Sequence, residues 1–228
     1  MRSSVAFSLL MIVASGNVLA QDLSSDKSKL SYAVGWDLGQ DIKRRNADFD
    51  VEALIAAIRD VTGDKTPQVE QPEMTRLLTE LQQKVRQEQL EAFQKLAEEN
   101  KTKSETFLTA NRAKTGIVVL PSGVQYRVIE EGDGARPGLE SSVKVHYRGS
   151  KVDGVEFDSS FARGVPEEFV VNNVLAGWQE VLPLMKQGST WQVFLPPELA
   201  FGQRGNPPAV GPNEALMFDL KLVEIISN

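Results

Sequence analysis

The hydrophobic residues near the N-terminus recur with the period of an α-helix. Between residues 26 and 45 the recurring apolar positions are Leu30, Val34, Leu38 and Ile42. The spacing predicts one amphipathic helix over this stretch. A second helix is predicted from Val51, with Asp50 as its N-cap and Gly63 at its end.

These two helices offer too little apolar area for a stable monomeric core. We therefore expect residues 21–70 to form an all-α dimerisation domain that packs against a second copy of itself.

A much longer helix is predicted over residues 71–114, where Glu73 to Ala113 contains neither Gly nor Pro. Its apolar stripe consists of Leu77, Leu78, Leu81, Val85, Leu90, Phe93 and Leu96. The stripe fades after Ala97, so the second half is predicted to be a solvent-exposed spacer in a connecting helix. A helix broken near Asn100 or Thr102 is the alternative.

From residue 115 onward the pattern changes to the two-residue alternation of β-strands. Apolar and polar residues alternate over 143–148 and again over 190–195, and a long strand is predicted over 215–226. Asp153-Gly154 is a hairpin signal, and a short helix is predicted over 175–186. Residues 115–228 are therefore predicted to be an α+β domain that folds alone.

Composition narrows the functional class. The 228 residues carry a net charge of −6 with a pI near 5, which argues against nucleic-acid binding. No apolar run reaches the ~20 residues of a membrane span. There is no cysteine and one histidine, so the sequence offers no metal-ligand cluster.

The first twenty residues have the pattern of a secretory signal peptide. Arg2 is followed by a short, largely apolar core over 5–13 and by Val18-Leu19-Ala20, a small-residue cleavage pattern. A buried N-terminal helix is the alternative.

Four motifs of the C-terminal half together resemble the FKBP-type peptidyl-prolyl isomerase signature. They are Val-His-Tyr-x-Gly at 145–149, Gly-x-x-Phe-Asp-Ser-Ser at 154–160, Gly177-Trp178 and Pro-x-x-Leu-Ala-Phe-Gly at 196–202. Residues 30–39 resemble the helical dimerisation module of the Mip-like and FkpA-like branch.

The resemblance implies a strongly bent antiparallel sheet wrapped around one short helix, with an apolar pocket that needs neither cofactor nor metal. The catalytic residues that it implies are Tyr147, Asp158, Trp178 and Phe201. The substrate-binding residues that it implies are Phe157, Phe169, Val174, Leu175, Val210 and Phe218. Glu167 departs from the common aromatic residue of the family, and Phe201 replaces its usual tyrosine.

Each charged or aromatic candidate has a structural alternative. Trp178 is interpreted as the pocket floor, although it could be plain core. Asp158 is expected to accept a hydrogen bond from Tyr147, the alternative being a cap of the following turn. His146 falls on the opposite strand face and is interpreted as non-catalytic, and Arg163 as a solvated loop charge.

The resemblance therefore implies a peptidyl-prolyl cis-trans isomerase that assists the folding of exported proteins in the periplasm, at the outer membrane or outside the cell. Expected partners are proline-containing unfolded or extended polypeptides, a second copy of the chain, and macrolides of the FK506 or rapamycin type. A dimeric chaperone or peptide-binding protein with weak or no turnover is the alternative function. A surface interaction factor is a third.

Overall fold

The computed structural model describes residues 22–44 and 48–227, so the predicted signal peptide over 1–20 lies outside the described residues. The chain divides into two compact units, with the boundary between Glu80 and Leu81. Each unit is described by itself. In the part of the chain that the structure covers, no helix is both long and apolar enough to cross a membrane.

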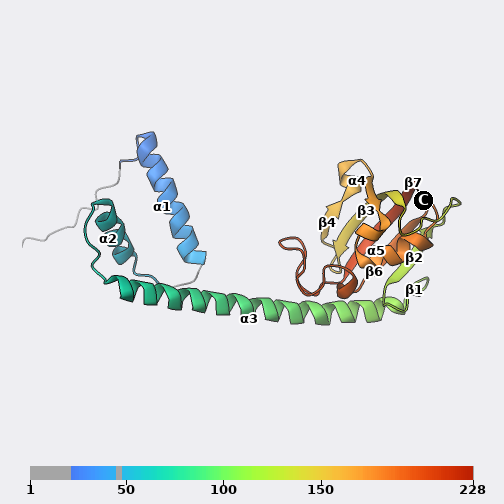
Figure 1. Ribbon diagram of the computed structural model, residues 1–228, viewed down its shortest axis with the longest axis horizontal. Helices are drawn as coiled ribbons and strands as arrows, with labels where there is room; N and C mark the ends of the chain where they lie inside the picture. The colour runs from blue at the N-terminus through green and yellow to red at the C-terminus, as the bar shows by residue number, and fades with distance from the viewer. Residues whose placement is uncertain (1–21, 45–47, 228) are drawn as a thin grey trace, which may run out of the picture. The chain divides into compact units, whose positions relative to one another are not determined.

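The N-terminal unit consists of α1 (Asp26–Arg44), α2 (Val51–Thr62) and the first turns of α3 (Gln71–Arg112) (Figure 1). The two short helices lie where the apolar periodicity predicts them. The Asp50 side chain accepts a hydrogen bond from the Ala53 backbone N–H at 3.1 Å, which satisfies a free donor of the first turn of α2. Gly63 ends this helix, as predicted.

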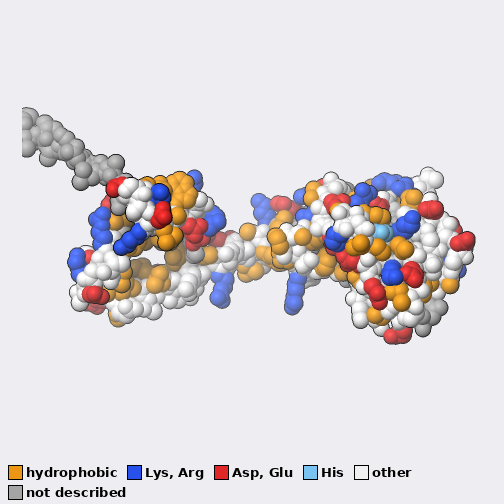
Figure 2. Space-filling model, turned by 90° about the horizontal axis from the view of Figure 1, so that it is seen from above, with side chains coloured by type: hydrophobic (Ala, Val, Ile, Leu, Met, Phe, Trp, Pro, Cys, Tyr) orange, Lys and Arg blue, Asp and Glu red, His pale blue; other side chains and the backbone are white. Residues whose placement is uncertain are grey.

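No described side chain of the N-terminal unit is buried. Val34 is 63% exposed and Trp36 is 60% exposed, although both are apolar. Hydrophobic side chains accordingly appear on the surface of this unit in Figure 2. The unit therefore has amphipathic helices but no hydrophobic core of its own.

The long helix is continuous, which confirms the prediction of one helix and excludes a break near Asn100. The prediction that its polar second half is a solvent-exposed spacer is wrong at four positions. The buried residues of α3 are Asn100, Ser104, Leu108 and Asn111. They are spaced three to four residues apart, so they form one face of the helix, and this face packs on the C-terminal sheet and its loops.

The C-terminal unit is built on an antiparallel sheet, as predicted. Its strands are β1 (Val118–Val119), β2 (Gln125–Glu130), β3 (Ser142–Lys151), β4 (Glu156–Ser159), β5 (Glu167–Val170), β6 (Thr190–Leu195) and β7 (Leu216–Ser227). The strand order is β1-β2-β6-β7-β3-β4, and β5 pairs with β3. The long pairing of β3 with β7 includes Tyr147 opposite Leu220, and a register shift near Val145 bends the ladder.

Short helical turns connect these strands. They are α4 (Ser160–Arg163), η1 (Val171–Asn173), α5 (Ala176–Val181), η2 (Leu182–Leu184) and η3 (Pro197–Leu199) (Figure 1). Trp178 and Val181 of α5 are buried in the same core as the inward residues of the sheet. The burial pattern of β3 alternates, with Val143, Val145 and Tyr147 inward, as the sequence predicts.

A second, smaller core lies between α3 and the sheet. It contains Leu108 of α3 together with Phe194 and Ala215. The rings of Phe107 and Phe194 lie 5.9 Å apart. The C-terminal half of α3 is thus an integral part of the C-terminal unit.

Candidate active site

An apolar cup of about 180 Å³ is lined by residues of the sheet, of α5 and of the connecting loops. Its lining consists of Tyr147, Phe157, Asp158, Phe169, Asn173, Val174, Leu175, Trp178, Phe201 and Phe218. Nine of the ten site residues predicted from the sequence are therefore brought together. Asn173, which the sequence did not single out, is added because η1 leads directly into the Val174-Leu175 segment.

The tenth predicted residue, Val210, does not line the cup. Its side chain is 1% exposed and packs in the main hydrophobic core. The reason is a tight turn in which Val210 pairs with Asn206 in an isolated β-bridge, so that the side chain points inward.

Trp178 forms the centre of an aromatic box. Its ring lies 5.3 Å from Tyr147, 5.9 Å from Phe169 and 5.1 Å from Phe218, with interplanar angles of 71° to 89°. Such edge-to-face contacts are the favoured geometry for aromatic pairs and hold each ring in place. The indole ring is 4% exposed, and its Nε1–H has no acceptor among the described residues.

Gly149 permits the close approach of two of these rings. A Cβ at this position would lie 2.7 Å from Phe157 and 2.8 Å from Phe218. Both rings line the cup, so any side chain at Gly149 would push against its wall.

A hydrogen-bonded polar group closes one side of the cup. The Tyr147 hydroxyl donates to Asp158 Oδ2 at 2.6 Å, as the sequence predicted. Arg163 Nη1 donates to Asp158 Oδ1 at 2.5 Å and Arg163 Nη2 donates to the Tyr147 oxygen at 2.9 Å. Glu167 forms an ion pair with Arg163 and lies 3.3 Å from the Tyr147 hydroxyl.

Arg163 is solvent-exposed, as predicted, but it is not a free loop charge, because it pairs with Asp158 and Glu167. Arg163 ends α4, a single turn that Ser159 caps through its hydroxyl, and this turn directs the guanidinium back toward Asp158. The five-residue separation of Arg163 and Asp158 was visible in the sequence, but only the capped turn makes it a contact.

Neither Tyr147 nor Asp158 has a pKa near neutral pH. Burial, followed by the hydrogen bond to Asp158, raises the pKa of Tyr147 to about 12. Partial burial acts to raise the pKa of Asp158, but the hydrogen bonds from Tyr147 and Arg163 outweigh it and leave this pKa below its usual value. Asp158 is therefore a carboxylate and Tyr147 a neutral phenol, which does not suit general acid–base catalysis.

His146 lies outside the cup, on the opposite face of β3, as predicted. Its Nδ1 is 3.1 Å from the Ser160 hydroxyl, and its ring stacks on Phe161 with centroids 4.7 Å apart. Within the described residues no group of acidic, histidine or cysteine side chains could hold a metal ion.

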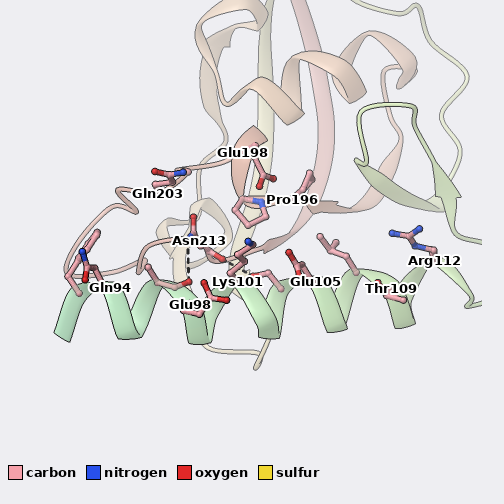
Figure 3. Close-up of a pocket in the computed structure, with 16 residues that line it drawn as sticks. Gln94, Glu98, Lys101, Glu105, Thr109, Arg112, Pro196, Glu198, Gln203 and Asn213 are labelled. Carbon is pink, nitrogen blue, oxygen red and sulfur yellow. Dashed lines mark hydrogen bonds between the residues drawn. The ribbon is translucent and has the colours of Figure 1, made fainter. Parts of the chain in front are cut away.

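A larger hollow of about 770 Å³ lies between α3 and the 196–213 loop (Figure 3). Ten of its sixteen lining residues are polar or charged, among them Glu98, Lys101, Glu105, Arg112 and Glu198. In the aromatic cup only Asp158 and Asn173 are of this kind, beside the Tyr147 hydroxyl, so the cup offers a proline ring the more apolar surroundings. The smaller aromatic cup is therefore the candidate site.

The sequence matches two known domain families. Residues 27–128 match the domain amino terminal to FKBP-type peptidyl-prolyl isomerase, and residues 134–223 match the FKBP-type peptidyl-prolyl cis-trans isomerase domain. The outer membrane protein MIP of Legionella longbeachae is 41% identical over 95% of this chain and 93% of its own length. The peptidyl-prolyl cis-trans isomerase Mip of Coxiella burnetii is 36% identical over 90% of each chain.

The fold has a solved counterpart as well. The crystal structure of FkpA from Escherichia coli aligns with a TM-score of 0.71 and 30% identity, covering 90% of this chain and 98% of that one. Both domains and nearly the whole length are thus shared with these relatives. The chain therefore belongs to the family of FKBP-type peptidyl-prolyl cis-trans isomerases and is an enzyme of that class.

Proposed function

We propose that the aromatic cup holds the proline ring of an X–Pro substrate and that its residues lower the barrier to rotation about the preceding bond. The observation that carries this assignment is the box of rings around Trp178, closed on one side by the Tyr147–Asp158 hydrogen bond. In the proposed roles, Trp178 is the floor, Phe201 and Phe218 are walls, and Asp158 holds the rim.

The mechanism needs no bond to be made or broken. The barrier of ~18–20 kcal/mol arises from amide resonance, and it makes uncatalysed exchange take tens to hundreds of seconds. A twisted amide has less charge separation than a planar one, so a water-poor apolar cup favours the twisted state. Only such differential binding accelerates the step, and a ~10⁴-fold effect requires roughly 5–6 kcal/mol.

A protease-coupled assay on an X–Pro peptide tests this site with two variants. We expect Asp158→Asn to lower kcat/KM about three- to tenfold, because it keeps the shape of the rim but removes the charge that holds Tyr147 and Arg163. We expect His146→Ala to change kcat/KM less than twofold, since this ring lies outside the cup.

The opposite result is equally clear. A collapse of activity in His146→Ala, with Asp158→Asn unaffected and both proteins folded, would show that acid–base chemistry is at work and that the desolvation mechanism is wrong. An FK506-type macrolide that fills the same cup is expected to inhibit turnover competitively. Inhibition that excess peptide does not relieve would place the macrolide elsewhere.

We infer that the protein acts on proline-containing polypeptides that are unfolded or extended, and that it assists the folding of exported proteins. The signal-peptide pattern of residues 1–20 supports export to the periplasm or to the outer membrane. A similar protein in Legionella longbeachae is named as an outer membrane protein. Fractionation of cells decides between the compartments, and recovery of uncleaved protein in the cytoplasm would contradict export.

We propose that the exposed apolar faces of the N-terminal unit pair two copies of the chain. Val34 and Trp36 of α1, Val61 of α2 and Leu78 of α3 are each at least 59% exposed in the single chain. Apolar helical faces of this extent cost free energy in water, and burial against a second copy removes the cost.

Sedimentation equilibrium of residues 21–228 is expected to give twice the chain mass. Val34→Lys should shift the population toward monomer, because it places a charge in the apolar face, without lowering kcat/KM on a short peptide. Gln40→Lys, on an exposed polar position of the same helix, is the matched control and should remain dimeric. A stable, monodisperse wild-type monomer would remove the proposal.

A further inference from the structure

The polar side chains that α3 buries are all hydrogen-bonded to the C-terminal unit. Asn111 Nδ2 donates to Gln125 Oε1 at 3.0 Å, and Gln125 Nε2 donates to the Leu108 carbonyl at 2.9 Å. Asn100 Nδ2 donates to the Pro212 carbonyl at 2.9 Å. A helix that only served as a spacer would leave these groups in water, so their burial indicates a specific role.

Asn213 connects α3 to the loop that carries Phe201. Its backbone N–H donates to the Gly202 carbonyl at 2.9 Å, and its side-chain Nδ2 donates to the Ala97 carbonyl of α3 at 3.2 Å. Its own carbonyl accepts a hydrogen bond from the Ser104 hydroxyl at 2.9 Å. Figure 3 shows Asn213 on the loop facing α3, with a dashed hydrogen bond to the helix.

The backbone at this point needs such support. Asn213 has a φ of 55°, in the left-handed region that few residues other than Gly and Asn adopt, and Gly202 opposite has a φ of 60°, which glycine adopts without strain. Left-handed residues persist where surrounding contacts hold them in place. The three hydrogen-bond partners of Asn213, which are Gly202, Ala97 and Ser104, therefore stabilise the loop in this conformation.

Ser104 is the central residue of this contact. Its side chain is 2% exposed, and its hydroxyl donates to Asn213 while accepting from the Ala215 backbone N–H at 2.7 Å. One hydroxyl thus satisfies two backbone groups of the loop. Ala215 directly precedes β7, which carries Phe218 of the cup, and Gly202 directly follows Phe201.

We propose that Ser104 is a positioning residue for the isomerase reaction: it holds the loop from α3, through Asn213 and Gly202, so that the Phe201 ring closes the cup. The inference rests on the proposed role of Phe201 in that cup. It makes the helix that precedes the catalytic sheet a part of the active-site support. A small displacement of a positioned group costs rate even when the fold is intact.

The test compares Ser104→Ala with Thr106→Ala, which removes a hydroxyl from an exposed position of the same helix. In full-length protein, Ser104→Ala is expected to lower kcat/KM on an X–Pro peptide about three- to tenfold, and Thr106→Ala to leave it unchanged. Asn100→Ala removes only the hydrogen bond to the Pro212 carbonyl and is expected to lower kcat/KM about twofold. It replaces Ser104→Ala in this test if Ser104→Ala does not fold.

A double-mutant cycle with Phe201→Ala separates positioning from general loosening of the fold. If Ser104 acts through the Phe201 ring, Ser104→Ala should have almost no further effect in a Phe201→Ala background, whereas a loss of stability should persist there. A kcat/KM equal to wild type, or a penalty that adds in full to that of Phe201→Ala, would overturn the inference. If Phe201→Ala lowers kcat/KM and Ser104→Ala does not, the inference about Ser104 is wrong but the proposed cup stands. If Phe201→Ala leaves kcat/KM unchanged, the proposed cup is wrong as well.

Discussion

Replacing Trp178 with leucine is expected to lower kcat/KM on an X–Pro peptide by at least about tenfold, equivalent to ~1.4 kcal/mol of transition-state stabilisation. Leucine keeps the site apolar but removes the flat floor against which Tyr147, Phe169 and Phe218 are held. No hydrogen-bond partner is stranded, because the indole N–H has no acceptor among the described residues. The loss therefore measures the shape of the cup.

Trp191→Leu is the matched control for this experiment. Trp191 is also 4% exposed and also has an indole N–H without an acceptor in the described part of the chain, but it stacks on Tyr126, away from the cup. Both variants should lose stability, by about 2–4 kcal/mol. Only Trp178→Leu should lose activity per folded molecule, and equal losses in the two variants would show that the activity follows stability alone.

A fragment of residues 92–228 is expected to be more stable than one of residues 115–228 by about 3–5 kcal/mol. The shorter fragment loses apolar burial and leaves polar groups unpaired. The shorter fragment lacks Leu108 and leaves Phe194 and Ala215 facing water. It also removes the partners of the Pro212 and Asn213 carbonyls.

Urea unfolding of the two fragments measures this difference. Leu108→Ala in the longer fragment should fall between them, because it removes the buried side chain of α3 but keeps the hydrogen bonds. Equal midpoints for the two fragments would show that the docked half of α3 adds nothing to stability. The prediction that 115–228 folds alone would then stand unmodified.

The local elements were accessible from the sequence because they depend on short-range periodicity. The apolar period near 3.6 places α1 and α2 within a residue or two of their observed bounds. Asp50 caps α2 as predicted, because its carboxylate accepts a hydrogen bond from the first turn. The inward face of β3 follows from alternation alone. The absence of Gly and Pro was enough to predict one long α3.

The site was predicted for a different reason. Its residues are spread over β3, β4, β5, α5, the 196–213 loop and β7, and no periodicity brings them together. The resemblance to a known family did so, because a shared fold implies shared neighbours. The resemblance did not place Val210 correctly, because the direction of this side chain is set by the conformation of one tight turn.

By itself the sequence determined the periodic elements, the motifs of the cup and the apolar faces left without a partner. Only the tertiary structure decided which polar side chains would be buried. Asn100, Ser104 and Asn111 have the composition of a solvated helix face. The tertiary structure also decided that Arg163, which stays exposed, pairs with Asp158. A polar group is buried where other groups satisfy its hydrogen bonds, and those partners lie up to 112 residues away in the chain, at Pro212 for Asn100.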